Sequence, residues 1–137
     1  MDRKAMMQRF YDEVLNAGNV EAMRELCTPG FIDHNPDPGQ EPTLEGVIAS
    51  FRQMRAAFPD MAVTVHDMIA EGDKVVSRVT MTATHEGDFQ GIPATGKQIS
   101  VDLIDMVRFE GDRAVERWGQ YDALGFMQQL GALSLPA

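Results

Sequence analysis

The chain has 137 residues, of which 44% are hydrophobic and 24% are charged, so it is long enough for one domain with its own core. A formal net charge of -9 disfavours nucleic acid and anionic membranes as partners, because both repel a negative protein at long range. Cys27 is the single cysteine, which excludes an intramolecular disulfide and suits a reducing compartment.

No targeting or membrane-spanning segment is apparent. The segment "MDRKAMMQRFYDEV" is charged and amphipathic, unlike the apolar centre of a signal peptide, and no apolar stretch is long enough to cross a bilayer. We therefore expect a single cytoplasmic domain spanning residues 1–137.

Helical spacing dominates the first part of the chain. Met6, Phe10, Val14 and Leu15 recur at helical intervals, and "NAGN" predicts a stop before a second helix in "VEAMRELC". A loop rich in Pro, Gly and Asp follows, with a short strand expected around residues 31–34.

A third helix is predicted over residues 44–58. Thr43 is a favoured residue for its N-terminal cap. Phe51, Met54 and Phe58 form its apolar stripe, and we expect Phe51 and Met54 to contact a bound small molecule.

The second part of the chain alternates with the period of strands. We predict a hairpin that turns at "EGD" and then a strand over "QISVDLIDMVRFE". A turn at "GDR" leads to a strand in "AVERWGQYD", and an amphipathic segment, "ALGFMQQLGAL", follows. Helices followed by hairpin-linked strands predict an α+β fold with a curved, mostly antiparallel sheet.

Asp105 interrupts an apolar stripe. Val101, Leu103, Val107 and Phe109 alternate as the buried face of a strand, and the same parity includes Asp105. A carboxyl in such surroundings is a candidate catalytic acid or base. Two structural explanations compete with this: a β-bulge that turns it outward, or a structural ion pair with an arginine such as Arg78 or Arg108.

Asp122 is the second candidate carboxyl. Asp122 shares its parity with Glu116, Trp118 and Gln120, so these four residues are expected on one face near the end of the last strand. They would form a polar cluster bordered by the Trp118 ring. The alternative is that Asp122 caps the helix that follows, since Asp is a favoured cap.

The three histidines show no spacing typical of a metal site, so no metal ligand is assigned. His85 shares its parity with Val79 and Met81 and is expected to point inward, although a lone His is more often a core or rim residue. His34 lies in a loop, where turn chemistry is the simpler explanation, and is kept as a candidate substrate contact.

Four motifs together carry a family resemblance. "AFPD", "AEGDKVV.R", "TH.GDF.GIPATGK" and "W...D..G...QLG" resemble the SnoaL-like polyketide cyclases and their ester-cyclase relatives, over nearly the whole chain. The resemblance implies the cone-shaped fold of nuclear transport factor 2-like proteins, in which a strongly bent sheet and its helices enclose a deep apolar pocket. Such a cone would give Asp105, Asp122 and His85 a common interior.

The resemblance also implies a reaction: intramolecular aldol closure of a hydrophobic, polyketide-like ester by proton transfer, without metal or cofactor. It assigns the proton shuttle to Asp122, the Asp of "W...D", and suggests that substrate is oriented by Tyr11, Asn35, His85 and Trp118. Isomerisation, hydration, epoxide hydrolysis and hydroxylase-like chemistry remain alternatives, as does a non-catalytic binding module, because this fold hosts them all. A homodimer through the outer face of the sheet is expected, where Val76, Ile104 and Met106 would need cover.

Overall fold

The computed structural model describes residues 2–133. The chain begins with α1 (Arg3–Arg9), a π-helical segment η1 (Phe10–Asn16), a 3-10 turn η2 (Val20–Ala22) and α2 (Met23–Leu26). Strand β1 (Cys27–Asp33) and helix α3 (Leu44–Ala57) follow, then the strands β2 (Ala62–Glu71), β3 (Lys74–Thr84), β4 (Gln98–Glu110) and β5 (Arg113–Tyr121), and finally α4 (Ala123–Gln129).

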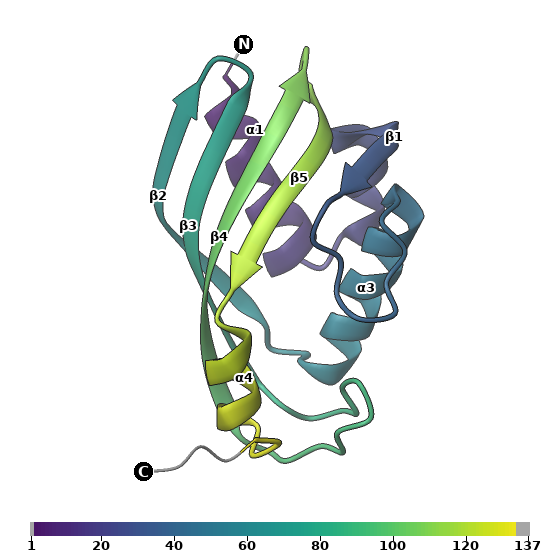
Figure 1. Cartoon of the computed structure of the whole chain (residues 1–137), viewed down its shortest axis with the longest axis vertical. Coiled ribbons are helices and arrows are strands. Elements are labelled where there is room, and N and C mark those ends of the chain that lie inside the picture. Colours follow the sequence, from purple (N-terminus) through teal and green to yellow (C-terminus); the bar gives the residue numbers. More distant parts are fainter. Residues whose placement is uncertain (1, 134–137) are drawn as a thin grey trace.

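The five strands form one open, curved sheet in the order β1-β5-β4-β3-β2. Three antiparallel pairings link β2 to β5, whereas β1 runs parallel to β5. In Figure 1 the helices α1 and α3 cover the same side of the sheet, and α4 lies at the end of β4 and β5. This confirms the predicted α+β fold of helices on a bent, mostly antiparallel sheet, with β1 making it mixed.

The first helix differs from the predicted regular one. From Phe10 it widens into π-helical bonding, as in the Ala17 N–H donating to the Asp12 carbonyl over 2.9 Å. The fully buried residues of this segment are Met7, Tyr11 and Val14, which also recur at helical intervals. Met6, Phe10 and Leu15 are only partly buried, so the predicted stripe was wrong by one position at Met6 and Phe10 and correct at Val14.

Helix α3 agrees with its sequence. The Thr43 side chain accepts a hydrogen bond from the Gly46 N–H at 3.1 Å and caps the helix, as predicted. By contrast, "VEAMRELC" forms only short turns, and Cys27 already belongs to β1. The strand predicted near residues 31–34 is therefore longer and begins earlier, because pairing with β5 extends it.

Candidate active site

A pocket of about 520 Å³ lies between the helices and the sheet. Its walls are mainly apolar, and they include residues of α1, η1, α3, β3, β4, the loop that joins β3 to β4, and α4: Met6, Phe10, Phe51, Met54, Val79, Leu103, Phe89 and Phe126. This places the predicted contacts Phe51 and Met54 at the pocket. The volume falls within the range of about 300–1,000 Å³ that is usual for small-molecule sites.

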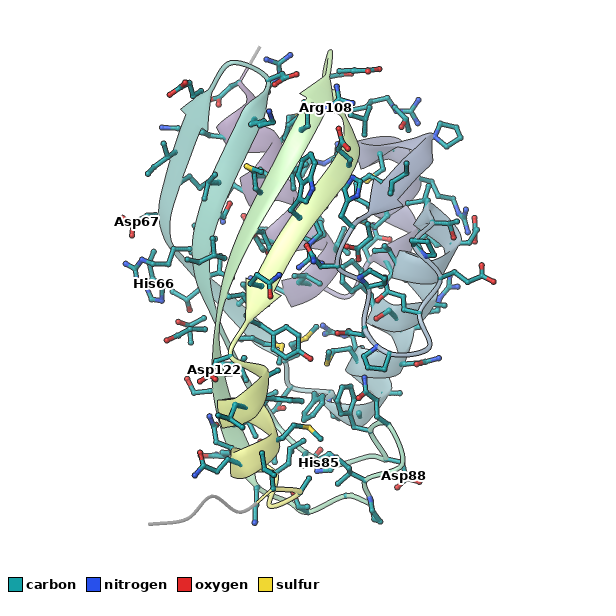
Figure 2. The ribbon with its side chains drawn as sticks, in the orientation of Figure 1. His66, Asp67, His85, Asp88, Arg108 and Asp122 are labelled. Carbon is teal, nitrogen blue, oxygen red and sulfur yellow. The ribbon has the colours of Figure 1, made fainter. Side chains whose placement is uncertain are left out.

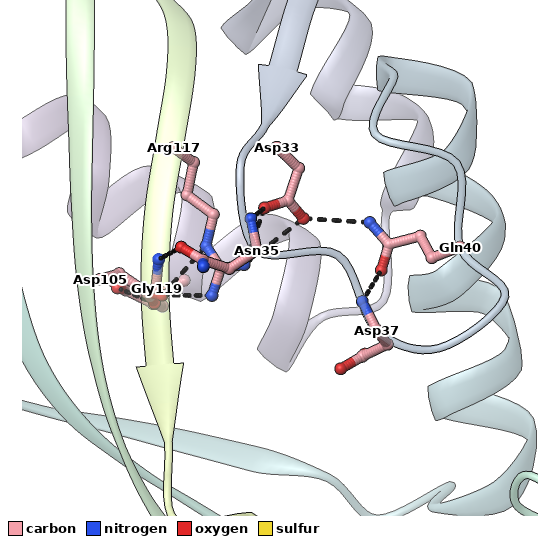
Figure 3. A network of polar contacts seen from close by, with 8 residues as sticks. Asp33, Asn35, Asp37, Gln40, Asp105, Arg117 and Gly119 are labelled. Atoms are coloured by element: carbon pink, nitrogen blue, oxygen red, sulfur yellow. Dashed lines mark hydrogen bonds and ion pairs between the residues drawn. The ribbon is translucent and has the colours of Figure 1, made fainter.

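The polar part of the pocket is centred on one guanidinium held between two buried carboxylates. Arg117 donates from Nη2 and Nε to Oδ1 of Asp105, at 2.6 and 3.1 Å, and from Nη1 to Oδ1 of Asp33 at 3.1 Å. Asp33 is 4% exposed and Asp105 is 7% exposed. Burial by itself lowers the pKa of Arg117, but the charges of Asp105 and Asp33 outweigh it and raise that pKa, so the guanidinium stays charged. Figure 3 shows this network.

Tyr11 reaches the same carboxylate from the first helix. Its hydroxyl donates to Oδ2 of Asp105 at 3.0 Å, and the side chain is fully buried. Burial and the neighbouring Asp105 charge raise the pKa of Tyr11, so the phenol keeps its proton and remains a donor. Tyr11, expected from the sequence as a pocket residue, thus links η1 to the polar centre.

Gly119 and Asn35 complete this centre. The Gly119 N–H donates to the Asn35 side-chain oxygen at 3.0 Å, which ties the loop after β1 to β5. A Cβ at position 119 would collide with the Arg117 guanidinium and with Oδ1 of Asp105, so only glycine leaves room for this ion pair. Asn35 lines the pocket, as expected.

Asp105 faces the pocket, and no bulge turns it outward. Its partner is Arg117 rather than Arg78 or Arg108, which are on the outer face: Arg78 pairs with Asp67, and Arg108 pairs with Glu116. The missed signal was the β4–β5 register. It sets Asp105 opposite Gly119 and Val107 opposite Arg117, so from Arg117 onward the odd-numbered positions of β5 are the inner ones.

This register corrects the expectation for Asp122 and Trp118. Glu116 and Trp118 share the outer face of the sheet, and Gln120, which follows on the same parity, borders the pocket; neither Trp118 nor Asp122 lines it. Asp122 is exposed, and its carboxylate accepts from the Gly125 N–H at 2.9 Å, capping α4. In Figure 2 it lies at the junction of β5 and α4.

His85 also lies outside the pocket lining. The ring is fully buried against Phe58, with centroids 5.3 Å apart, and its Nδ1 is paired with the Thr95 hydroxyl at 3.0 Å. Its backbone N–H donates to Lys97, so His85 holds together the loop that joins β3 to β4. The expected inward orientation is confirmed, but the common interior with Asp105 and Asp122 is not.

His34 belongs to the outer face. Its ring stacks on Trp118 at 4.7 Å, and its Nε2 is paired with Glu116 at 2.7 Å. The structure thus brings together Asp105, Tyr11, Asn35, Phe51 and Met54 at the pocket and leaves His34, His85, Trp118 and Asp122 away from it. Sequence reasoning missed Arg117, Asp33 and Asp37, all of which line it.

Comparison with known proteins agrees with this architecture. The SnoaL-like polyketide cyclase family matches residues 5–130. The chain belongs to the SnoaL-like polyketide cyclases. Two curated relatives are aklanonic acid methyl ester cyclases, DauD of Streptomyces sp. strain C5 and DnrD of Streptomyces peucetius. Each is 27% identical over 87% of this chain, and the match covers 76% of DauD and 84% of DnrD.

Solved structures superpose closely on this chain. TsrD from Streptomyces laurentii is 33% identical, with a TM-score of 0.86 over 97% of this chain and 99% of its own. IdmH from Streptomyces antibioticus is 31% identical, with a TM-score of 0.83 over 96% of this chain and 99% of its own. The bent sheet with its helices is therefore the nuclear transport factor 2-like fold that the motifs implied.

Two further features concern residues 2–133 only. No helix among them combines the length and the apolar character that a bilayer crossing requires. No group of three His, Cys, Asp or Glu side chains within this range is arranged to hold a metal ion.

Proposed function

We propose that this SnoaL-like protein is a cofactor-independent cyclase that closes a ring on a polyketide ester by intramolecular aldol chemistry. The observation that carries the proposal is a buried Asp105–Arg117 ion pair with a Tyr11 donor, set into an otherwise largely apolar pocket. Apolar walls suit a polycyclic substrate, and the polar centre suits a carbonyl that becomes an enolate.

Asp105 is the base in this proposal. Its Oδ1 accepts two hydrogen bonds from Arg117, whereas its Oδ2 accepts one, from Tyr11, and so keeps acceptor capacity. Asp105 removes a proton from the carbon next to a carbonyl, and the resulting enolate carbon attacks a second carbonyl of the same molecule. A carbon–carbon bond forms, the new alkoxide takes up a proton, and the product is an isomer of the substrate.

Arg117 supplies electrostatic stabilisation. The guanidinium stays charged and has N–H groups beyond those bonded to Asp33 and Asp105, so it can stabilise oxygen atoms that gain negative charge, whereas the single Tyr11 hydrogen is donated to Asp105 and orients that carboxylate. Their network fixes them before substrate arrives, which reduces the reorganisation that the reaction requires.

The test uses aklanonic acid methyl ester, the substrate named for the two curated relatives. Chromatography with mass detection follows its conversion to a cyclised isomer of equal mass. Asp105→Asn should lose about 1,000-fold in turnover, since general acid–base catalysis contributes on the order of 10²–10⁴. Asp102→Asn is the matched control, because Asp102 lies on the same strand but is exposed and bonded to Thr80.

Three outcomes separate the possibilities. Parent-like turnover by Asp105→Asn would refute the role of Asp105. Saturable binding of the ester without conversion by the parent protein would favour a non-catalytic binding module instead. Equal loss in Asp105→Asn and Asp102→Asn would indicate damage to the strand rather than to the chemistry.

We also propose that a second copy of the chain covers the outer face of the sheet. Neighbouring strands carry an apolar patch there, made of Ile69, Val76, Ile104 and Met106. Ile104, on the central strand β4, is 53% exposed, and Ile69, on the edge strand β2, is 66% exposed, so a contiguous apolar surface is left uncovered. Sedimentation should report a dimer for the parent and a monomer for Ile104→Asp; a monomeric parent at all concentrations would contradict this interface.

A further inference from the structure

Three aspartates line the pocket, and two of them are bonded to Arg117. Asp33 accepts from Arg117, from the Asn35 N–H at 3.0 Å and from the Gln40 amide at 3.0 Å. Asp105 accepts from Arg117 and Tyr11. The single charge of Arg117 is therefore shared by two carboxylates, and a third aspartate, Asp37, lines the same pocket.

Asp37 stands apart from this ion-pair network. Within residues 2–133, no Lys or Arg side chain forms an ion pair with it. Figure 3 shows its carboxyl without a partner among the residues drawn and turned back toward the sheet, while its backbone N–H is bonded to Gln40. The Asp37 carboxyl is therefore close to charged groups of the pocket but forms no ion pair with a Lys or Arg side chain of residues 2–133.

The loop holds Asp37 firmly in place. Asp37 lies between Pro36 and Pro38, whose rings restrict the backbone. The Gln40 side chain accepts from the Asp37 N–H at 3.2 Å and donates to Asp33, and the Gln40 N–H donates back to the Asp37 carbonyl at 2.9 Å. These contacts fix Asp37 relative to the Arg117 network, as a group that reacts with a bound substrate requires.

The surroundings of Asp37 favour its neutral form. Burial raises the pKa of Asp37, and the negative charge of Asp33 on β1 acts in the same direction. Arg117 and the Tyr121 phenol on β5 oppose this without reversing it. Asp37 is half-buried and so remains able to exchange protons with solvent.

We propose that Asp37 is a second catalytic carboxyl of this site, the acid that protonates the alkoxide formed at ring closure. This rests on the proposed cyclase function. The pocket then separates its carboxyls by environment: Asp105 forms an ion pair with Arg117 and takes a proton, whereas Asp37 forms no ion pair within residues 2–133 and gives one.

The proton balance closes over one turnover. One proton moves from the substrate carbon to Asp105, the carbon–carbon bond forms as one carbonyl becomes an alkoxide, and one proton moves from Asp37 to that oxygen. Asp105 then carries an extra proton and Asp37 lacks one, and exchange with water on product release restores both. No oxidant, reductant or metal enters the balance.

The test compares Asp37→Asn and Asp37→Glu with the parent protein, using aklanonic acid methyl ester. Asp37→Asn keeps the shape of the side chain and breaks no ion pair, so the fold and the binding affinity, measured by calorimetry, should be retained. Its kcat should fall about 100-fold, and Asp37→Glu should recover part of that loss. Asp88→Asn is the matched control, because Asp88 is an exposed aspartate on another loop and does not line the pocket.

The pH profile separates a catalytic acid from a residue that only shapes the loop. An acid must be protonated, so kcat of the parent should fall as pH rises through the pKa of Asp37. This limb should be absent from the residual activity of Asp37→Asn and present in Asp88→Asn. Parent-like kcat, or an unchanged limb, in Asp37→Asn would overturn the role of Asp37 and leave the cyclase function intact. Absence of turnover by the parent would overturn both.

Discussion

Replacement of Arg117 by methionine tests the physical basis of the pocket most directly. Arg117 lies between Asp33 and Asp105, both almost fully buried, and its four donor contacts to them measure between 2.6 and 3.4 Å. Methionine fills much of the same volume but supplies neither charge nor donors. In the parent protein Asp33 and Asp105 share the charge of Arg117; in the variant the two carboxylates would face each other in an apolar pocket without a cation.

The expected loss of stability is large. Removing one partner of a buried ion pair costs about 3–5 kcal/mol, because the remaining charge stays desolvated. Here one cation serves two carboxylates, so we expect about 5 kcal/mol. Domains of this size are stable by roughly 5–15 kcal/mol, so the variant should be close to its unfolding threshold.

The assay is urea unfolding followed by circular dichroism, with Arg78→Met as the matched control. Arg78 is also on the sheet, but its ion pair with Asp67 is exposed, with side chains 56% and 59% accessible. Exposed pairs contribute about 0–1 kcal/mol, so the control should shift the midpoint little. Combining Arg117→Met with Asp105→Asn should restore part of the stability, because one of the two stranded charges is gone.

A loss below about 1 kcal/mol for Arg117→Met, equal to that of the control, would refute the reasoning. It would mean that water reaches both carboxylates and that the pocket does not hold its charges in a desolvated centre. The stabilisation of an enolate by Arg117 would then be correspondingly weak.

Two further predictions follow from the positions of Asp122 and Cys27. Asp122→Asn should keep both stability and turnover, because asparagine caps helices as well as aspartate, whereas Asp122→Ala should cost about 1 kcal/mol in unfolding experiments. If the Asp122→Asn protein folded well but had no turnover, Asp122 rather than Asp105 would be the residue that transfers the proton. Burial raises the pKa of the Cys27 thiol to about 12. Its reaction with a thiol reagent in mildly alkaline buffer should therefore be on the order of a thousandfold slower in the native protein than in urea, and rapid native labelling would show that the pocket opens.

The sequence by itself determined the local elements of this protein and one of its pocket carboxyls. Thr43 and the apolar stripe behind it specify α3 through contacts within a few residues. Gly72 and Gly111, both at φ +60, mark the two hairpin turns, because this backbone conformation favours glycine. Strict alternation through Asp105 predicted that side chain among apolar neighbours, since successive residues of a strand point to opposite faces, and the regular β3–β4 register then excluded a bulge there.

Only the tertiary structure decided which side of β5 faces the pocket. Alternation divides a strand into two faces, but both faces of β5 mix charged and apolar residues, so the pattern does not say which one is inner. A register shift between Arg108 and Phe109 determines which residues of β5 face the pocket: it places Arg117 opposite Val107, on the inner face, and Trp118 opposite Met106, on the outer face. The parallel pairing of β1 with β5 then brings Asp33 to Arg117, 84 residues away along the chain. Contacts of that range depend on how the whole sheet pairs and bends, which no local pattern encodes.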